Sequence, residues 1–341
     1  LLLLAIVAIG PSLAPYQVVG TNPRAYLNAG EISPPYPPSD RFLLGTDAQG
    51  RDILSLLLVG ARRTLSIALL ATLARVLVGT VLGFMAGWFA GSPLDRALMA
   101  IVEALSAFPA LLLAMLVVYA VGIQQGMSAF VIGLAFVGWG EVLQTVRAEV
   151  MSIKPKDYIE SAVATGLSEG QILTAHVLPN VWPTIVSLAF LEMGGVLMLL
   201  GELGFLGVFI GGGFTASGDD MPSLVYYDVP EWSVMLANSW ASFRSFPWAM
   251  LYPALAFFLA ILAFTFIGEG LRWLSEQVTL SMSHVFNRTT LVASAVLVVV
   301  VLGIFAEASP YAQFRKRALA YNSERALQDA ATLASEQFNG R

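Results

Sequence analysis

The pentapeptide Gly-Leu-Ser-Glu-Gly at residues 166–170 has the spacing of a nucleophile elbow, the turn that presents the catalytic serine of many hydrolases. That turn requires a strand before the serine, together with a histidine and an acid that complete a triad. Here Ser168 lies between two segments that favour helix, and Gln171 gives it a helix-capping role. The pattern therefore favours a cap over a catalytic serine. An intramembrane hydrolase, the alternative, would be recognised by labelling of Ser168.

Side chains that bind metals or phosphates are sparse. The chain has no cysteine and two histidines, His176 and His284, which are far apart in the sequence. Neither a thiolate nor a histidine metal site is therefore expected. Lys154 and Lys156 follow no glycine-rich turn, so they form no phosphate-binding loop. The net charge of −5 argues against nucleic acid as a partner. We expect no catalytic residue, metal or cofactor on this chain.

Residues 157–180 form a polar, helix-favouring interruption in an otherwise apolar chain. Asp157 with Glu160, and Ser168 with Gln171, have the reciprocal spacing of capping boxes. Gly166 is suited to end the first helix, and Pro179 is expected to stop the second. Each arm has about ten residues, too few to cross a hydrocarbon core of about 30 Å. The pattern predicts a helical hairpin that presents a rigid surface to a partner in solution.

The surrounding sequence is that of a membrane protein. Hydrophobic residues make up 57% of the chain, charged residues make up 12%, and mean hydropathy is +0.74. No ordinary soluble domain of this length has such values. A transmembrane β-barrel would instead show alternating short segments. We predict an all-α, polytopic bundle with spans at 64–90, 97–121, 127–147, 183–209, 247–273 and 290–306. Residues 1–13 are interpreted as the outer end of a truncated first span, with a signal-peptide core as the alternative.

The hairpin sequence resembles a known family signature. The run Glu-Ser-Ala at 160–162, then Gly166, then Leu-Pro at 178–179 is similar to the EAA loop of bacterial ABC importer permeases, with serine in place of the first alanine. The ending His-Val-Leu-Pro-Asn at 176–180 resembles the dipeptide/oligopeptide/nickel branch. In that family the loop docks in a cleft of the ATPase subunit. The resemblance implies docking roles for Asp157, Glu160, Ala162, Gly166, Ser168, His176, Leu178 and Pro179.

The same resemblance implies partners and an orientation. The family's permease pairs with a second homologous permease, two ATPase subunits that bind ATP and Mg, and an extracytoplasmic binding protein, in the bacterial inner membrane. A cytoplasmic hairpin places residues 16–62 and 211–246 outside, and residues 91–96 and 274–288 inside. The charge distribution alone does not settle this orientation. A secondary transporter or channel not driven by ATP is the alternative, but it would not explain the capped hairpin.

Further matches set the predicted domain boundaries. Residues 44–62, 203–207, 231–233, 247–253 and 268–272 resemble segments of the same family, so the permease domain is predicted at 1–277, with an outer segment at 16–62 and the coupling loop at 152–180. Arg75, Gly204 and everything after about residue 278 depart from the family pattern. Within this family the substrate is set largely by the binding protein. Dipeptides, oligopeptides and nickel chelates therefore all remain open.

Two charges lie deep within predicted spans. Counted along their helices, Arg75 and Glu192 both fall near the middle of a core about 30 Å thick. Unpaired charges at that depth are costly, so each must face protein or a water-filled path. We predict that the two side chains form an ion pair or line the pathway together. The alternative is that each finds backbone carbonyls or water separately.

Small residues and a proline predict helix contacts and a kink. Glycines recur every fourth residue along the span at 64–90, a spacing that lets helices approach closely within the chain or against the partner permease. These glycines are Gly79, Gly83, Gly87 and Gly91. Pro109 is expected to kink the span at 97–121.

The tail carries predictions of its own. Residues 278–310 are predicted to add a seventh span, centred on the apolar run 291–306. Parity would place the C-terminus outside, whereas the basic residues at 315–317 favour the inside. Residues 311–341 form an amphipathic helix that resembles the opening of di-zinc aminopeptidases, with a plain solvated helix as the alternative.

Overall fold

The computed structural model describes residues 9–16, 35–210, 214–216, 224–226, 230–240 and 242–277. The predicted seventh span and tail helix lie outside these residues, as does most of the predicted first span. The part described here belongs to one compact unit that extends to Phe286.

Four long helices form the body of this unit: α3 (Ile53–Trp88), α6 (Met127–Ile153), α9 (Leu178–Phe205) and α11 (Trp248–Gln277). In the described part of the chain, four helices are long and apolar enough to span a membrane, or five if a bent pair counts as one span. These five match the predicted spans from 64–90 to 247–273. The helical bundle is therefore confirmed, with one addition. Two three-residue strands, β1 (Phe214–Ala216) and β2 (Leu224–Tyr226), pair antiparallel.

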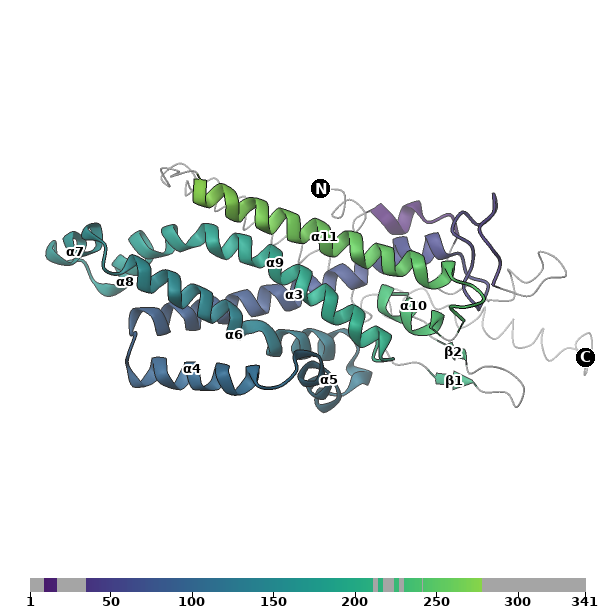
Figure 1. The fold of residues 1–341 in the computed structure, drawn as a ribbon, viewed down its shortest axis with the longest axis horizontal. Coiled ribbons are helices and arrows are strands. Elements are labelled where there is room, and N and C mark those ends of the chain that lie inside the picture. Colours follow the sequence, from purple (N-terminus) through teal and green to yellow (C-terminus); the bar gives the residue numbers. More distant parts are fainter. Residues whose placement is uncertain are drawn as a thin grey trace, which may run out of the picture. The chain divides into compact units, whose positions relative to one another are not determined.

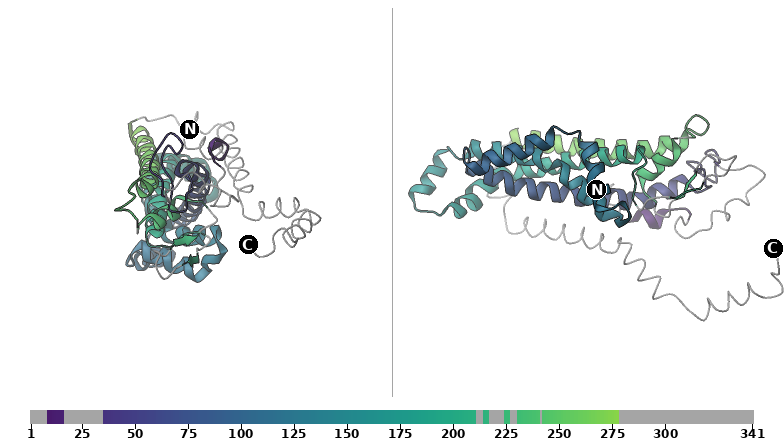
Figure 2. Two further views of the ribbon diagram at one scale, coloured as in Figure 1. Left: turned by 90° about the vertical axis from the view of Figure 1, so that its right-hand side faces the viewer. Right: turned by 90° about the horizontal axis from the view of Figure 1, so that it is seen from below.

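The chain runs back and forth along the long axis of the bundle. One end of the bundle carries the turn between α3 and α4 (Pro93–Ser106), the end of α11, and a short helical hairpin made of α7 (Asp157–Ala164) and α8 (Glu169–Ile172) (Figure 1). We call it the hairpin end. The start of α3 and helix α10 (Trp232–Ser239) lie at the other, which we call the far end (Figure 1). Figure 2 shows from another side that the hairpin projects beyond the long helices. The alternation of loops between the two ends agrees with the predicted topology.

The predicted span at 97–121 is a broken pair of helices. Helix α4 (Pro93–Ser106) and helix α5 (Ala110–Val121) meet at a bend of 95°. Pro109 is the N-cap residue of α5, so the bend predicted at this proline is present, but as a break between two helices and not as a kink within one. The residue before a proline is pushed out of the helical region, and the helix ends there. A 3-10 turn, η1 (Ile123–Gln125), then leads into α6.

The predicted glycine stripe joins α3 to α6 of the same chain. A Cβ atom on Gly79, Gly83 or Gly87 would lie 2.5, 2.8 and 2.7 Å from the Cβ atoms of Val142, Val146 and Val150, respectively. The two backbones therefore approach more closely than any larger residue would permit.

Gly91 does not belong to this stripe, contrary to the prediction. Helix α3 ends at Trp88, two residues before the predicted limit, and Gly91 lies in the following turn with φ of +82°. A Cβ atom there would meet nothing within 4 Å. Its role is conformational, because residues other than glycine rarely adopt this backbone angle.

Polar contacts brace the helices at the hairpin end. Arg147 of α6 binds Asp95 of α4 through two bonds, Nε–Oδ1 of 2.6 Å and Nη2–Oδ2 of 2.8 Å, and the Gly91 N–H donates to Asp95 Oδ2 at 2.8 Å. Lys154 Nζ donates to the carbonyl of Trp88 at 2.6 Å and lies over its ring. These basic residues therefore hold α3, α4 and α6 together at this end of the bundle.

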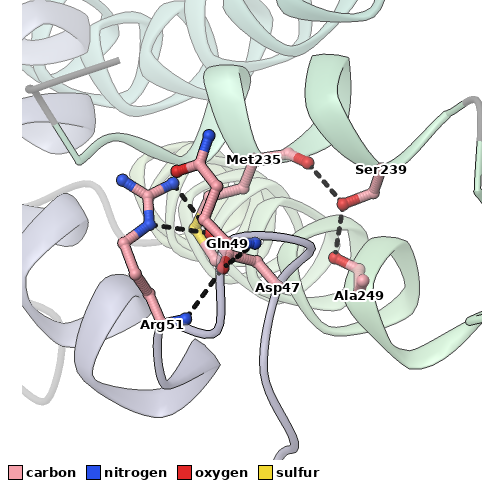
Figure 3. A network of polar contacts seen from close by, with 6 residues as sticks. All are labelled: Asp47, Gln49, Arg51, Met235, Ser239 and Ala249. Carbon is pink, nitrogen blue, oxygen red and sulfur yellow. Dashed lines mark hydrogen bonds and ion pairs between the residues drawn. The ribbon is translucent and has the colours of Figure 1, made fainter. Parts of the chain in front are cut away.

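At the far end, a turn of alternating charges starts α3. Asp47 accepts from the backbone N–H groups of Gln49 and Arg51, both at 2.9 Å, and pairs with the Arg51 guanidinium at 2.7 Å (Figure 3). Asp52 then caps the helix by accepting from the Ser55 N–H at 2.8 Å. Because α3 has 36 residues and a length of about 54 Å, it extends well beyond a hydrocarbon core of about 30 Å. The last ten residues of the predicted outer segment, 53–62, thus belong to α3.

Hydrogen bonds of Glu231 and its neighbours fix helix α10 to α3, to α11 and to the segment that follows α9. Glu231 is fully buried, and its Oε1 accepts from the Ile210 N–H at 3.0 Å and from Ser233 Oγ at 2.6 Å. Trp232 donates through its backbone N–H to Thr64 Oγ1 of α3. On the other side of α10, Ser239 Oγ contacts the carbonyls of Met235 and of Ala249 in α11 (Figure 3).

Glu231 is buried although it falls within residues 211–246, the loop predicted to lie outside the membrane. Its Oε2 atom has no hydrogen-bond partner among the described residues. Burial raises the pKa of Glu231 to about 7, against the lowering effect of Ser233, Ile210 and the nearby charge of Arg63. Desolvation of the charged form outweighs these partners.

Replacing Gly83 with alanine should destabilise the subunit by about 1–3 kcal/mol, because the added Cβ overpacks the contact between α3 and α6. Gly195→Ala in α9 is the matched control, since its Cβ would meet nothing within 4 Å. Thermal unfolding of both variants in detergent measures the difference. Equal stability of the two would contradict the close packing described above.

The raised pKa of Glu231 predicts a pH-dependent stability. The carboxyl has an ordinary pKa of 4.5 and a folded-state pKa of about 7, so the folded state binds the proton more tightly. The contribution of Glu231 to the free energy of unfolding is then greatest below pH 4.5 and falls by roughly 3 kcal/mol as pH rises to about 7. Glu231→Gln should flatten this fall in thermal unfolding, whereas Gln at the exposed Glu103 should not. An unchanged slope in Glu231→Gln would show that another group titrates.

Candidate functional site

The turn of the hairpin is built on Gly166. Helix α7 (Asp157–Ala164) ends in a Schellman motif: the Gly166 N–H donates to the Val163 carbonyl at 3.0 Å, and the Leu167 N–H donates to the Ala162 carbonyl at 3.3 Å. Gly166 has φ of +86°, a conformation that strains any residue with a side chain. The predicted role of Gly166 as the C-cap is confirmed.

The two predicted capping boxes have different outcomes. At the start of α8 (Glu169–Ile172), the backbone N–H and the hydroxyl of Ser168 both donate to Gln171 Oε1 at 2.9 Å, as predicted. At the start of α7, Lys156 is the N-cap residue and no side chain caps the helix, so the prediction for Asp157 is wrong. Asp157 and Glu160 lie in the first turn of α7, where a negative charge interacts favourably with the positive end of the helix dipole.

The second arm does not stop at Pro179, contrary to the prediction. Helix α8 continues through a π-helical turn, η2 (Leu173–Val177), directly into α9. In this wide turn the Leu178 N–H bonds to the Leu173 carbonyl. Pro179 follows as the second residue of α9, where its missing N–H disturbs the helix least. Residues Glu169–Phe205 thus form one continuous helical segment.

An apolar cluster fixes the hairpin to the ends of the long helices. Ile159, Ala162, Ile172 and Val177 of the hairpin region are buried in one cluster, together with residues from α3, α6 and α9. The cluster residues of these long helices include Trp88, Val150, Ile153 and Val181. Ala162 is therefore part of the hairpin's own core, and its small side chain lets the arms pack. A displacement of the hairpin must move the helices on which it is seated.

The outward face of the hairpin is both acidic and apolar. Of the residues predicted to dock, Asp157, Glu160, Gly166 and Ser168 are exposed, whereas His176, Leu178 and Pro179 are half-buried where the second arm joins α9. Tyr158, Val163 and Leu167 are exposed as well, although the sequence analysis did not single them out. Partial desolvation by the neighbouring residues raises the pKa of the Tyr158 hydroxyl above its ordinary value. The apolar side chains in an otherwise polar segment were the signal that could have identified them.

The surroundings of Ser168 do not fit an elbow serine. The residue follows one helix and caps the next, where an elbow requires a strand before the serine. Within the residues that the structure describes, no group of three His, Cys, Asp or Glu side chains is placed to hold a metal ion.

The predicted pair of membrane charges is present. Arg75 Nη1 of α3 lies 3.0 Å from Glu192 Oε2 of α9, and the two residues are 4% and 8% exposed. Arg75 Nε donates to the carbonyl of Leu134 in α6 at 2.7 Å. A Cβ atom on Gly138 of α6 would overlap the guanidinium group, so a third helix supplies the space for it.

Comparisons with known proteins agree with this arrangement. Residues 79–318 match the family described as "Binding-protein-dependent transport system inner membrane component". The glutathione transport system permease protein GsiD of Pectobacterium atrosepticum is 34% identical over 272 residues, which are 80% of this chain and 82% of the relative. The dipeptide transport system permease protein DppC of Alkalihalophilus pseudofirmus is 32% identical over 271 residues, 80% of each chain.

Two further similarities are more distant or shorter. The oligopeptide transport system permease protein OppC of Haemophilus influenzae is 30% identical over 228 residues, 67% of this chain and 68% of the relative. Among solved structures, a chain of the MetNI methionine ABC transporter in an inward-facing conformation has a TM-score of 0.49 and 16% identity, covering 64% of this chain and 95% of that chain.

The hairpin between α6 and α9, the apolar helices and the extent of these matches lead to one assignment. The chain belongs to the family of binding-protein-dependent transport system inner membrane components and is a permease subunit of a peptide-type ABC importer in the bacterial inner membrane.

Proposed function

We propose that the hairpin of α7 and α8 is the element through which this permease receives the movement of an ATPase subunit. The observation that carries the proposal is the continuous helical segment from Glu169 to Phe205. A force on the hairpin acts directly on α9, because no loop separates α8 from α9. The buried cluster under the hairpin passes the same force to α3 and α6.

The exposed residues of the hairpin indicate how the ATPase is recognised. Tyr158, Val163 and Leu167 offer apolar contact area at the tip, and such anchors contribute most of the energy in protein interfaces. Asp157 and Glu160 place negative charge beside them, which suits a basic group on the ATPase. His176, Leu178 and Pro179 support the arm from its base. ATP and Mg are bound by the ATPase subunits in this proposal.

The names of the relatives suggest the cargo. The permeases that resemble this chain over most of its length are named for glutathione, dipeptide and oligopeptide transport. We therefore propose that the complete importer carries short peptides, delivered by an extracytoplasmic binding protein to a pathway between this subunit and a second permease.

Replacing Gly166 with valine should uncouple transport from ATP hydrolysis while leaving the subunit in the membrane. A β-branched residue cannot adopt φ of +86° without strain, so the turn that sets the angle between the arms is distorted. ATP-driven peptide uptake into proteoliposomes is the measurement. Gly170→Val is the matched control, since Gly170 lies in the same hairpin without a positive φ and its Cβ would meet nothing within 4 Å. Undiminished uptake in Gly166→Val would overturn the proposal.

A further inference from the structure

We propose that Arg75, Glu192 and Gly138 form a clamp that makes α9 and the α3–α6 pair move as one body during transport. The clamp would carry a displacement of the hairpin into the middle of the membrane. This inference rests on the coupling role proposed for the hairpin, and it adds positioning residues that lie far from the ATPase.

The clamp joins three helices at one point. Arg75 extends from α3, pairs with Glu192 of α9 at 3.0 Å and donates to the Leu134 carbonyl of α6 at 2.7 Å. One turn away, Thr72 Oγ1 contacts Met193 Sδ at 3.7 Å, again between α3 and α9. The guanidinium group fits because Gly138 has no side chain. A planar group held by two partners in fixed directions defines the relative position of all three helices.

Both charged residues lie at the same depth. Arg75 is thirteen residues before Trp88 at the hairpin end of α3, and Glu192 is fourteen residues after Leu178 at the hairpin end of α9. At a helical rise of 1.5 Å per residue these separations are about 20 Å. Trp88 and the first turn of α9 meet in the buried cluster under the hairpin. The two helices are therefore joined at the hairpin and again about 20 Å further into the membrane.

Burial makes the clamp resistant to opening. Separating Arg75 from Glu192 would leave two unpaired charges in a medium that does not solvate them, and such separation is strongly unfavourable. The contact of α3 with α6 is close along the glycine stripe, so α6 follows α3. Opening of the pathway must then come from movement of this three-helix body against α11, the α4–α5 pair or the partner subunit.

A purely structural role makes a different prediction. If the pair only sets the register of the helices during folding, well-packed apolar residues should replace it without loss of transport, as they can for buried ion pairs elsewhere. The double variant R75M/E192L distinguishes the two roles, because it leaves no unpaired charge. Gly138→Ala is a second route to the same defect, since its Cβ displaces the guanidinium group while both charges remain.

The experiment uses the complete transporter, containing this subunit at full length, in lipid nanodiscs. The sequence shown has no cysteine, so a cysteine introduced into it provides a defined labelling site. Spin labels are attached at two exposed positions, through Leu77→Cys in α3 and Met198→Cys in α9. The distance between the labels is measured without nucleotide and with ATP trapped by vanadate. With the native clamp this distance should be the same in the two states. In R75M/E192L and in Gly138→Ala it should differ, and transport per ATP should fall by roughly fivefold or more.

Gly195→Ala is the control, and it should behave like the unaltered subunit. A distance that changes between states with the native clamp would overturn the inference, as would native transport in R75M/E192L. Thermal unfolding and co-purification with the partner subunits establish that each variant is assembled. Failure of the proposed coupling role would appear separately, as intact uptake in Gly166→Val.

Discussion

The unbroken helix from the hairpin into α9 is the constraint on which the rest of the structure depends. A proline inside a helix removes one backbone hydrogen bond and tends to kink or break the helix. The π turn at Leu173–Val177 instead lets the helix pass Pro179. The hairpin is thereby attached to α9 through backbone hydrogen bonds, and its movement cannot be absorbed by a loop.

Close approach of the helices distributes this movement. The glycines of α3 bring its backbone against α6, and Gly204 of α9 brings α9 against Ser233 of α10. Such contacts interdigitate without spare volume, so they transmit displacement. Polar contacts then fix the ends: Asp95 with Arg147 at the hairpin end, and Glu231 at the far end. The Arg75–Glu192 ion pair holds α3 and α9 together near the middle of the membrane.

Two kinds of feature could be predicted from the sequence: those set by short-range sequence signals, and those set by the energetic cost of burying a charge. The turn at Gly166 was predictable because a helix C-cap depends on one residue's backbone freedom. The pair of Arg75 with Glu192 was predictable because two opposite charges at equal depth in apolar helices have few other partners.

Features that depend on tertiary packing were not predictable in this way. Pro109 breaks a span and Pro179 does not, although both follow the same local rule. Glu231 lies among loop acids in the sequence, and its burial becomes visible only when α3, α10 and the end of α9 are assembled. Gly91 continued a regular spacing, but the helix had already ended at Trp88.

The central claim is that the hairpin tip contacts an ATPase subunit, and a site-specific cross-link tests it most directly. A single cysteine at the exposed Val163, introduced into this cysteine-free sequence, would carry a short photoactivated cross-linker in the assembled transporter. We predict that the cross-link joins the subunit to the ATPase, and that the same reagent at Leu43, exposed near the far end, does not. A cross-link from Val163 to lipid alone, or to no partner, would contradict the account.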